Sequence, residues 1–196
     1  MPIPIHSGTP CKIRGPMPDM PQSKASGPVE WIVCPTNLGV LYLAVNEQGL
    51  QRLTWGVRQR VVCHRARRQR PPWLARLCRL LQRYARGERV SFDDIPVDVS
   101  GLPAFARRVL EAARQIAYGE VTTYGALARR VGQPGAARAV GQALAHNPVP
   151  IVIPCHRVVR ADGTLGGFSA ARGITKRRLL ALEQGQRSEA RGSYCQ

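Results

Sequence analysis

Acidic residues are scarce in this chain of 196 residues, and so is lysine. Twelve Asp and Glu stand against 29 Lys and Arg, so the formal net charge is +17 and the pI is about 11.1. All but three of the basic residues are arginine, whose planar guanidinium suits phosphate groups and base edges. The composition therefore favours a polyanion such as DNA as the partner.

Long apolar runs are also absent. No stretch of 18 apolar residues, no signal-peptide core and no separate basic amphipathic helix is found, so we expect neither a membrane span nor a membrane partner. The cysteines are too scattered for a disulfide framework, so free thiols and a cytoplasmic location are expected. They are Cys11, Cys34, Cys63, Cys78, Cys155 and Cys195. The hydrophobic content of 44% is ordinary and sufficient for a core.

Changes in composition divide the chain into four parts. Residues 1–28, rich in Pro, Gly and Ser, are predicted to be a disordered tail, and the polar residues 185–196 a flexible tail. The acidic segment Asp93–Asp98, which contains a proline, is predicted to be a linker. It separates an N-terminal α/β domain at 29–98 from a helical C-terminal domain at 99–184.

The N-terminal domain begins with three strand-like runs. Residues 31–34, 40–45 and 50–55 are rich in β-branched and aromatic residues and are separated by short turns, which predicts an antiparallel meander. Pro71 and Pro72 then open a helix that keeps a helical apolar period as far as Gly87.

Residues 52–89 hold twelve arginines and a single acid, Glu88. Such a run is either a solvated surface or a direct contact with DNA, and the sequence leaves both open. Cys63 and His64 could join Cys78 at a metal site, but the spacing matches no standard zinc pattern. No metal is therefore expected.

The C-terminal domain reads as a series of helices. An apolar stripe predicts a helix from Pro103 to Ala117, and Thr122 or Thr123 is placed to cap a second helix at 124–131. A turn of Gly and Pro leads to a third helix at 136–145, which completes a helix-turn-helix pattern.

The third helix is built almost wholly of Ala and Gly, with Arg138 as its one long cation. Small side chains let a helix press closely against a protein core or into a DNA groove. A lone arginine on such a helix could enter the base stack and hold open the place of a displaced nucleotide. The charge of residues 101–185, twelve Lys and Arg against four Asp and Glu, favours the DNA interpretation.

The stretch from Pro150 to Val159 holds the strongest candidate site. Residues 151–153 predict a short buried strand that ends at a proline, followed at once by Cys155 and His156. A cysteine held rigidly at the rim of a core suits a nucleophile. On an extended chain the two side chains would point opposite ways, so a water would link them. The alternative is a buried structural cysteine beside a surface histidine.

Two later segments complete the candidate site. Leu165–Gly173 is a glycine-rich loop whose backbone N–H groups could face a ligand, or else an ordinary surface loop. A final helix at Lys176–Gln184 carries Glu183 near its end, either in a functional position or as an exposed side chain.

Several segments together resemble the methylated-DNA–protein-cysteine methyltransferases, also called O6-alkylguanine-DNA alkyltransferases. The similarity is close over residues 100–184, weaker over 30–99, and absent from both tails. The matching segments, in family order, are Tyr118–Tyr124, Ala137–Gly141, Asn147–Pro150, Ile153–Val159 and Leu179–Glu183.

The resemblance implies an α+β fold, in which a ribonuclease-H-like α/β domain precedes a helical domain with a winged-helix-like helix-turn-helix. It also implies catalytic roles. Cys155 would accept the alkyl group, His156 would act as its base through a water, Glu183 would orient the imidazole, and Asn147 would hold the chain between recognition helix and active site. The other implied residues are Tyr124, Val158, Ser169 and Lys176 for the substrate, and Tyr124, Ala137, Arg138 and Arg157 for DNA.

The implied function is DNA repair by irreversible transfer of an alkyl group from O6-alkylguanine to Cys155. The damaged nucleotide must first leave the duplex, because its O6 cannot be reached inside the stack. The expected partner is double-stranded DNA containing O6-alkylguanine, and repair of O4-alkylthymine is left open. We expect a monomer without a cofactor, used once, because a thioether cannot return to a thiol by hydrolysis.

The sequence departs from the family pattern in the glycine-rich loop. Phe168 stands where many members have tyrosine, and Ala170–Gly173 stands where a glycine pair is usual, with an extra residue. No counterpart is found for the N-terminal zinc ligands of some animal members.

Other classes of function remain open. The chain could be a DNA-binding regulator in which Cys155 is a redox sensor or a structural thiol. It could also be a catalytically silent lesion-sensing relative, although such proteins generally lack the acceptor cysteine. A cysteine hydrolase is disfavoured, because no oxyanion-hole motif accompanies the basic helix-turn-helix.

Overall fold

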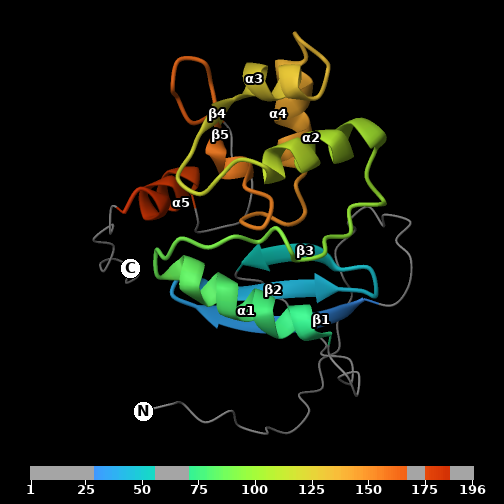
Figure 1. The fold of residues 1–196 in the computed structure, drawn as a ribbon, viewed down its shortest axis with the longest axis vertical. Helices are drawn as coiled ribbons and strands as arrows, with labels where there is room; N and C mark the ends of the chain where they lie inside the picture. Colours follow the sequence, from blue (N-terminus) through green and yellow to red (C-terminus); the bar gives the residue numbers. More distant parts are fainter. Residues whose placement is uncertain (1–28, 56–70, 167–174, 186–196) are drawn as a thin grey trace, which may run out of the picture.

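The computed structural model describes residues 29–55, 71–166 and 175–185. Figure 1 shows a small sheet with one helix across it at one end of the molecule, and a group of short helices at the other end. The predictions made for both tails, for the arginine-rich residues 58–70 and for loop residues 167–173 lie outside the described residues.

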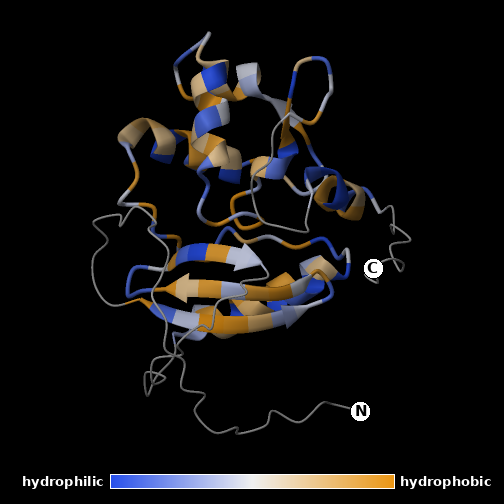
Figure 2. Cartoon of the chain, turned by 180° about the vertical axis from the view of Figure 1, so that it is seen from behind, coloured by the Kyte–Doolittle hydropathy of each residue, from blue (hydrophilic) through white to orange (hydrophobic). Residues whose placement is uncertain are grey.

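The N-terminal part forms the predicted antiparallel meander. Strands β1 (Glu30–Thr36), β2 (Gly39–Val45) and β3 (Leu50–Trp55) pair in the order β1-β2-β3. Successive side chains of a strand point to opposite faces, and the alternate residues Leu41 and Leu43 of β2 lie in the core. Figure 2 shows how hydrophobic β2 is along most of its length.

Helix α1 (Pro72–Ala85) covers one face of this sheet, as Figure 1 shows. It begins with a proline at its first position, where no N–H is needed. It ends before Gly87, whose φ of 83° is one that glycine adopts readily. Its buried face consists of Leu74, Leu77, Leu80, Leu81, Tyr84 and Ala85. Burying each of the leucines contributes roughly 1.5–3 kcal/mol.

The acidic segment Asp93–Asp98 is packed against both halves of the molecule. Val97 forms a parallel bridge with Leu50 of β3, and Asp98 is buried and accepts a hydrogen bond of 2.5 Å from Asn46. Arg114 donates to three carbonyl oxygens of residues 92–95. The segment therefore joins the two halves firmly, which its polar composition did not indicate.

The helical half is close to the prediction. Helices α2 (Ala104–Arg114), α3 (Tyr124–Arg130) and α4 (Ala137–Ala145) pack on one another. Of the two candidate caps, the one at α3 is Thr123, whose hydroxyl accepts a hydrogen bond of 3.1 Å from Ala126 N.

The strand predicted at residues 151–153 is not formed, so this prediction is wrong. Ile151 has a φ of 72°, in the left-handed region that a β-branched residue rarely adopts and that a strand excludes. The side chain of Asn147 holds the turn, because it donates to Ile153 O at 2.8 Å and accepts from Val149 N at 3.1 Å. These side-chain hydrogen bonds take the place of the backbone hydrogen bonds that a strand would have formed with a neighbouring strand.

A single turn of 3-10 helix, η1 (Cys155–Arg157), follows Pro154. Strand β5 (Val158–Val159) comes next and pairs in parallel with β4 (Thr122–Thr123). Because Cys155 starts a helical turn, the expectation of neighbouring side chains on opposite sides of an extended chain does not apply here.

Helix α5 (Lys176–Glu183) packs against η1, with the Thr175 hydroxyl capping its first turn. One hydrophobic cluster runs from the sheet through α1 and α2 to Val158 and Leu179. Both halves therefore share a core around η1. None of the helices within the described residues is long and apolar enough to cross a membrane.

Candidate active site

Cys155 is the first residue of η1, and it is buried, with 5% of its surface exposed. Its backbone N–H donates to Ile153 O at 2.9 Å, and Ile153 O also accepts from Asn147. Asn147 and the backbone N–H of Cys155 thus share one acceptor, which ties the chain after α4 to the turn that carries the cysteine.

Burial raises the pKa of the Cys155 thiol above its ordinary value. A hydrogen bond from Asn147 and the positive charge of Lys176 act in the opposite direction but do not outweigh burial. The resting residue is therefore a protonated thiol, and a nucleophilic thiolate requires a base.

His156 is fully buried, which excludes the surface histidine of the alternative interpretation. Its Nε2 lies 2.7 Å from Oε1 of Glu183. Burial lowers the pKa of His156, although Glu183 opposes the shift, so the imidazole is neutral near pH 7. Since a carboxylate only accepts, we assign the hydrogen to Nε2. Nδ1 then carries the lone pair, and it has no hydrogen-bond partner among the described residues.

Glu183 is buried and accepts five hydrogen bonds. The donors are His156 Nε2 (2.7 Å), the Tyr84 hydroxyl (2.8 Å), Arg157 Nε (2.9 Å), Arg157 Nη2 (3.0 Å) and Gly119 N (3.1 Å). Burial alone would raise the pKa of Glu183, but the bonds from His156 and Arg157 outweigh it and hold the pKa at about 2. The carboxylate stays ionised and orients the imidazole.

The placement of Arg157 differs from the prediction that it contacts DNA. The residue is 6% exposed, and its guanidinium donates to both oxygens of Glu183 and to Ile116 O. Because the guanidinium makes these bonds inside the protein, its positive charge balances the negative charge of Glu183 and does not face the solvent. Arg157 therefore belongs to the network around the imidazole.

Tyr84 is a member of this network that the sequence did not reveal. In the sequence it fills one position of the apolar stripe of α1, and nothing there distinguishes it from the leucines beside it. In the structure its hydroxyl reaches Glu183 at 2.8 Å and lies 3.3 Å from His156 Nε2. Only the packing of α1 against the helical half brings these groups together.

Lys176 and Tyr124 lie together near Cys155. Lys176 is 3% exposed and donates to Val158 O and, at 3.3 Å, to the hydroxyl of Tyr124. Burial lowers the pKa of Lys176 to about 8, although the nearby Cys155 opposes the shift. The structure thus gathers three of the predicted substrate-binding residues beside the thiol. The fourth, Ser169, lies outside the described residues.

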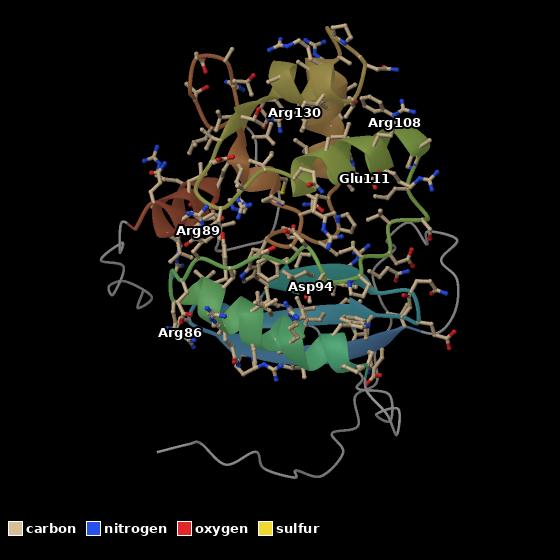
Figure 3. The ribbon with its side chains drawn as sticks, viewed as in Figure 1. Arg86, Arg89, Asp94, Arg108, Glu111 and Arg130 are labelled. Atoms are coloured by element: carbon tan, nitrogen blue, oxygen red, sulfur yellow. The ribbon has the colours of Figure 1, made fainter. Side chains whose placement is uncertain are left out.

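The predicted DNA-binding residues Ala137 and Arg138 lie on the first turn of α4. Arg138 is exposed and forms no ion pair with another described residue, whereas Val140 on the opposite side is buried in the core. Figure 3 shows Arg130 at the same end of the molecule, far from Arg86 at the α1 end. Among the described residues, no cluster of three or more His, Cys, Asp or Glu could hold a metal ion.

Two family models match the chain. Residues 29–99 match the model described as 6-O-methylguanine DNA methyltransferase, ribonuclease-like domain. Residues 104–185 match the model described as 6-O-methylguanine DNA methyltransferase, DNA binding domain. The α/β half and the helical half thus correspond to the two domains of one family.

Individual proteins agree with these models. A methylated-DNA–protein-cysteine methyltransferase of Mycolicibacterium paratuberculosis is 49% identical over 102 residues, or 52% of this chain and 59% of that protein. The match thus spans little more than half of this relative. A DNA base-flipping protein of Thermus thermophilus is 38% identical over 149 residues, which is 76% of this chain and 96% of that protein.

The fold has a similar solved relative as well. The crystal structure of Mycobacterium tuberculosis OGT in complex with DNA has a TM-score of 0.66 and 36% sequence identity, over 81% of this chain and 94% of that one. In this arrangement the ribonuclease-like domain contributes Tyr84, and the DNA-binding domain carries Cys155, His156 and Glu183. The chain belongs to the 6-O-methylguanine DNA methyltransferase family.

Proposed function

We propose that this protein repairs DNA by transferring the alkyl group of O6-alkylguanine to its own Cys155, once per molecule. The observation that carries the proposal is the buried thiol beside the His156–Glu183 pair, in a chain whose two domains match this family. A single chain supplies every residue that the proposal needs, so we take the acting unit to be a monomer.

The first step is the formation of a thiolate. Nδ1 of His156, which carries the lone pair of the neutral imidazole, takes the proton of Cys155 through a water, while Glu183 stabilises the imidazolium that results. The ionised Lys176 near the sulfur favours the thiolate as well. Holding the thiol neutral until a base acts protects it from unproductive oxidation.

The second step is displacement at the alkyl carbon. The sulfur forms a bond to this carbon as the carbon–O6 bond breaks, and the electron pair of the broken bond goes to the guanine. Tyr124 and Lys176 can stabilise the negative charge on the departing base, and the base then takes up a proton. The product is a thioether and a normal guanine, so the protein cannot turn over.

DNA binding is assigned to the helical domain. We infer that α3 and α4 act as a helix-turn-helix, with the exposed start of α4 against the duplex and Arg138 in the gap left by the flipped nucleotide. Arg129 and Arg130 at the end of α3 are exposed and can contact phosphates. The solved relative named as OGT in complex with DNA supports this partner.

A second candidate function is lesion sensing without transfer. The DNA base-flipping protein of Thermus thermophilus, matched over 96% of its length, favours it. Alkyl transfer is favoured by Cys155 and by the pairing of His156 with Glu183, because a lesion sensor needs no base beside a thiol. The two candidates differ in a covalent product and so can be separated directly.

The test is a mass measurement. The protein is incubated with an excess of duplex DNA that carries one O6-methylguanine, and the intact mass is followed. We expect a gain of one methyl group and no further change, with the methyl on the peptide that contains Cys155. An unchanged mass together with tight binding of the damaged duplex would identify a sensor, and repair of more lesions than protein molecules would exclude single use.

Replacing Arg138 by alanine distinguishes the flipping of the nucleotide out of the duplex from the alkyl transfer itself. We expect Arg138→Ala to slow repair of duplex DNA about tenfold or more, because unstacking costs a few kcal/mol that the arginine offsets. Reaction with free O6-benzylguanine requires no flipping and should keep its rate. Arg108→Ala, an exposed arginine on α2, is the matched control for lost charge. Equal slowing of both reactions by Arg138→Ala would mean that the arginine supports the fold.

A further inference from the structure

Tyr84 connects the ribonuclease-like domain to the catalytic histidine. It lies on α1 and is 0% exposed, and its hydroxyl donates a hydrogen bond of 2.8 Å to Oε1 of Glu183. The same hydroxyl lies 3.3 Å from His156 Nε2, and the two rings meet edge to face with centroids 6.5 Å apart. A residue of the other domain therefore touches both members of the His156–Glu183 pair.

We propose that Tyr84 is a positioning residue for the proposed alkyl transfer, through which the ribonuclease-like domain sets the orientation and basicity of His156. The inference rests on the proposed function, because it concerns the base that activates Cys155. It assigns a catalytic contribution to a domain whose described residues otherwise contribute no polar atom to the contacts of the imidazole and carboxylate.

The argument begins with the shared oxygen. Oε1 of Glu183 accepts from His156 Nε2 at 2.7 Å, from the Tyr84 hydroxyl at 2.8 Å and from Arg157 Nη2 at 3.0 Å, so Tyr84 is one of three donors, the imidazole included, that share this atom. The hydrogen bond from the Tyr84 hydroxyl reduces the effect of the negative charge of Glu183 on the imidazole. Tyr84 thereby helps to keep His156 neutral and ready to accept a proton.

The hydroxyl is a permanent donor. Burial and the neighbouring carboxylate of Glu183 raise the pKa of Tyr84 well above its ordinary value, so the proton stays on the oxygen. The ring is equally constrained, because it packs against Phe92 and Tyr118 with centroids 6.1 and 6.0 Å away. A fixed donor of fixed protonation state is what a positioning role requires.

The alternative is that Tyr84 only fills the core. Ring packing explains the aromatic side chain, and phenylalanine would serve equally well for that purpose. It does not explain a hydroxyl in a fully buried position, where such a group is costly unless it is bonded. Among the described residues, the bonds of this hydroxyl go to the catalytic pair.

The test compares two conservative variants. Tyr84→Phe removes the hydroxyl and keeps the ring. Tyr118→Phe is the matched control, because its hydroxyl donates to Gly87 O at 3.1 Å and so also links the two domains, but without bonding to Glu183 or His156. Each variant loses a hydroxyl that bonds across the two domains, and thermal unfolding checks that both remain folded.

Two readouts are followed as a function of pH. One is the rate of reaction with free O6-benzylguanine, and the other is the NMR titration of the His156 ring. We expect Tyr84→Phe to react about tenfold more slowly at neutral pH, because the base is less well oriented. We also expect the acid limb of the rate and the titration of His156 to move to higher pH, because Glu183 acts more fully on the imidazole. Tyr118→Phe should resemble the unmodified protein in both.

An unchanged His156 titration in Tyr84→Phe would overturn the inference, and so would an equal shift in Tyr118→Phe. The NMR readout requires no alkyl transfer. If the unmodified protein fails to react with any O6-alkylguanine, the proposed function fails, while the titration still decides whether Tyr84 governs His156.

Discussion

Cys155→Ser is expected to abolish alkyl transfer completely while leaving binding of damaged DNA intact. A serine hydroxyl has a far higher pKa than a thiol, and a neutral buried imidazole cannot remove its proton to a useful extent. The substitution changes a single atom at a position that is 5% exposed, so the turn and its bonds should persist. Intact mass after incubation with O6-methylguanine DNA measures transfer, and gel shift measures binding.

Cys34→Ser is the matched control for this prediction. Cys34 is 1% exposed, and its Sγ lies 3.9 Å from Cys78 O. The hydrogen bond with Cys78, together with burial, raises the pKa of Cys34, so this thiol is a poor nucleophile. The variant should still gain one methyl group. Methylation of any other cysteine in Cys155→Ser would show that the network around His156 is not what selects the acceptor.

Elements with a strong local signal could be predicted from the sequence. The meander follows from alternating side chains and turn residues, and α1 follows from a proline at its start, an apolar stripe and Gly87 at its end. A cap at Thr122 or Thr123 follows from hydroxyls placed just before an apolar period, and the structure selects Thr123. In each case the information lies within a few residues of the element itself.

The active-site turn could not be predicted in this way. Residues 151–153 have the composition of a strand, but Asn147 supplies hydrogen bonds that make a turn with Ile151 at a positive φ. Side-chain bonds of this kind depend on a partner several residues away and override β-propensity. In the sequence, the motif at Ile153–Val159 rather than the strand is what singles out Cys155.

The partners of Glu183 were the least predictable feature. Tyr84 precedes the glutamate by 99 residues and belongs to a different domain. Arg157 looks like one more member of an arginine-rich surface until burial places it on Glu183. The composition does not distinguish among the 26 arginines, and only tertiary packing shows that Arg157 neutralises a buried carboxylate.

Glu183→Gln is expected to lower both stability and activity strongly. An amide matches the carboxylate in size, but its NH2 group would face donors from His156 or Arg157 and could not accept from them. Removing one member of a buried ion pair leaves the other uncompensated, which costs about 3–5 kcal/mol of unfolding free energy. The imidazole also loses its orienting acceptor, so alkyl transfer should fall about a hundredfold or more.

Urea unfolding at several pH values tests this prediction. In the unmodified protein the pKa of Glu183 lies at about 2, below its ordinary 4.5, so its contribution is present above pH 4.5 and is lost as the pH falls toward 2. The stabilities of the protein and Glu183→Gln should therefore converge over this range. Glu88→Gln is the control: it removes an exposed carboxylate that forms ion pairs with Arg83 and Arg86, and it should change stability little. A constant difference from pH 7 to pH 2 would show that the loss comes from packing and not from the charge of Glu183.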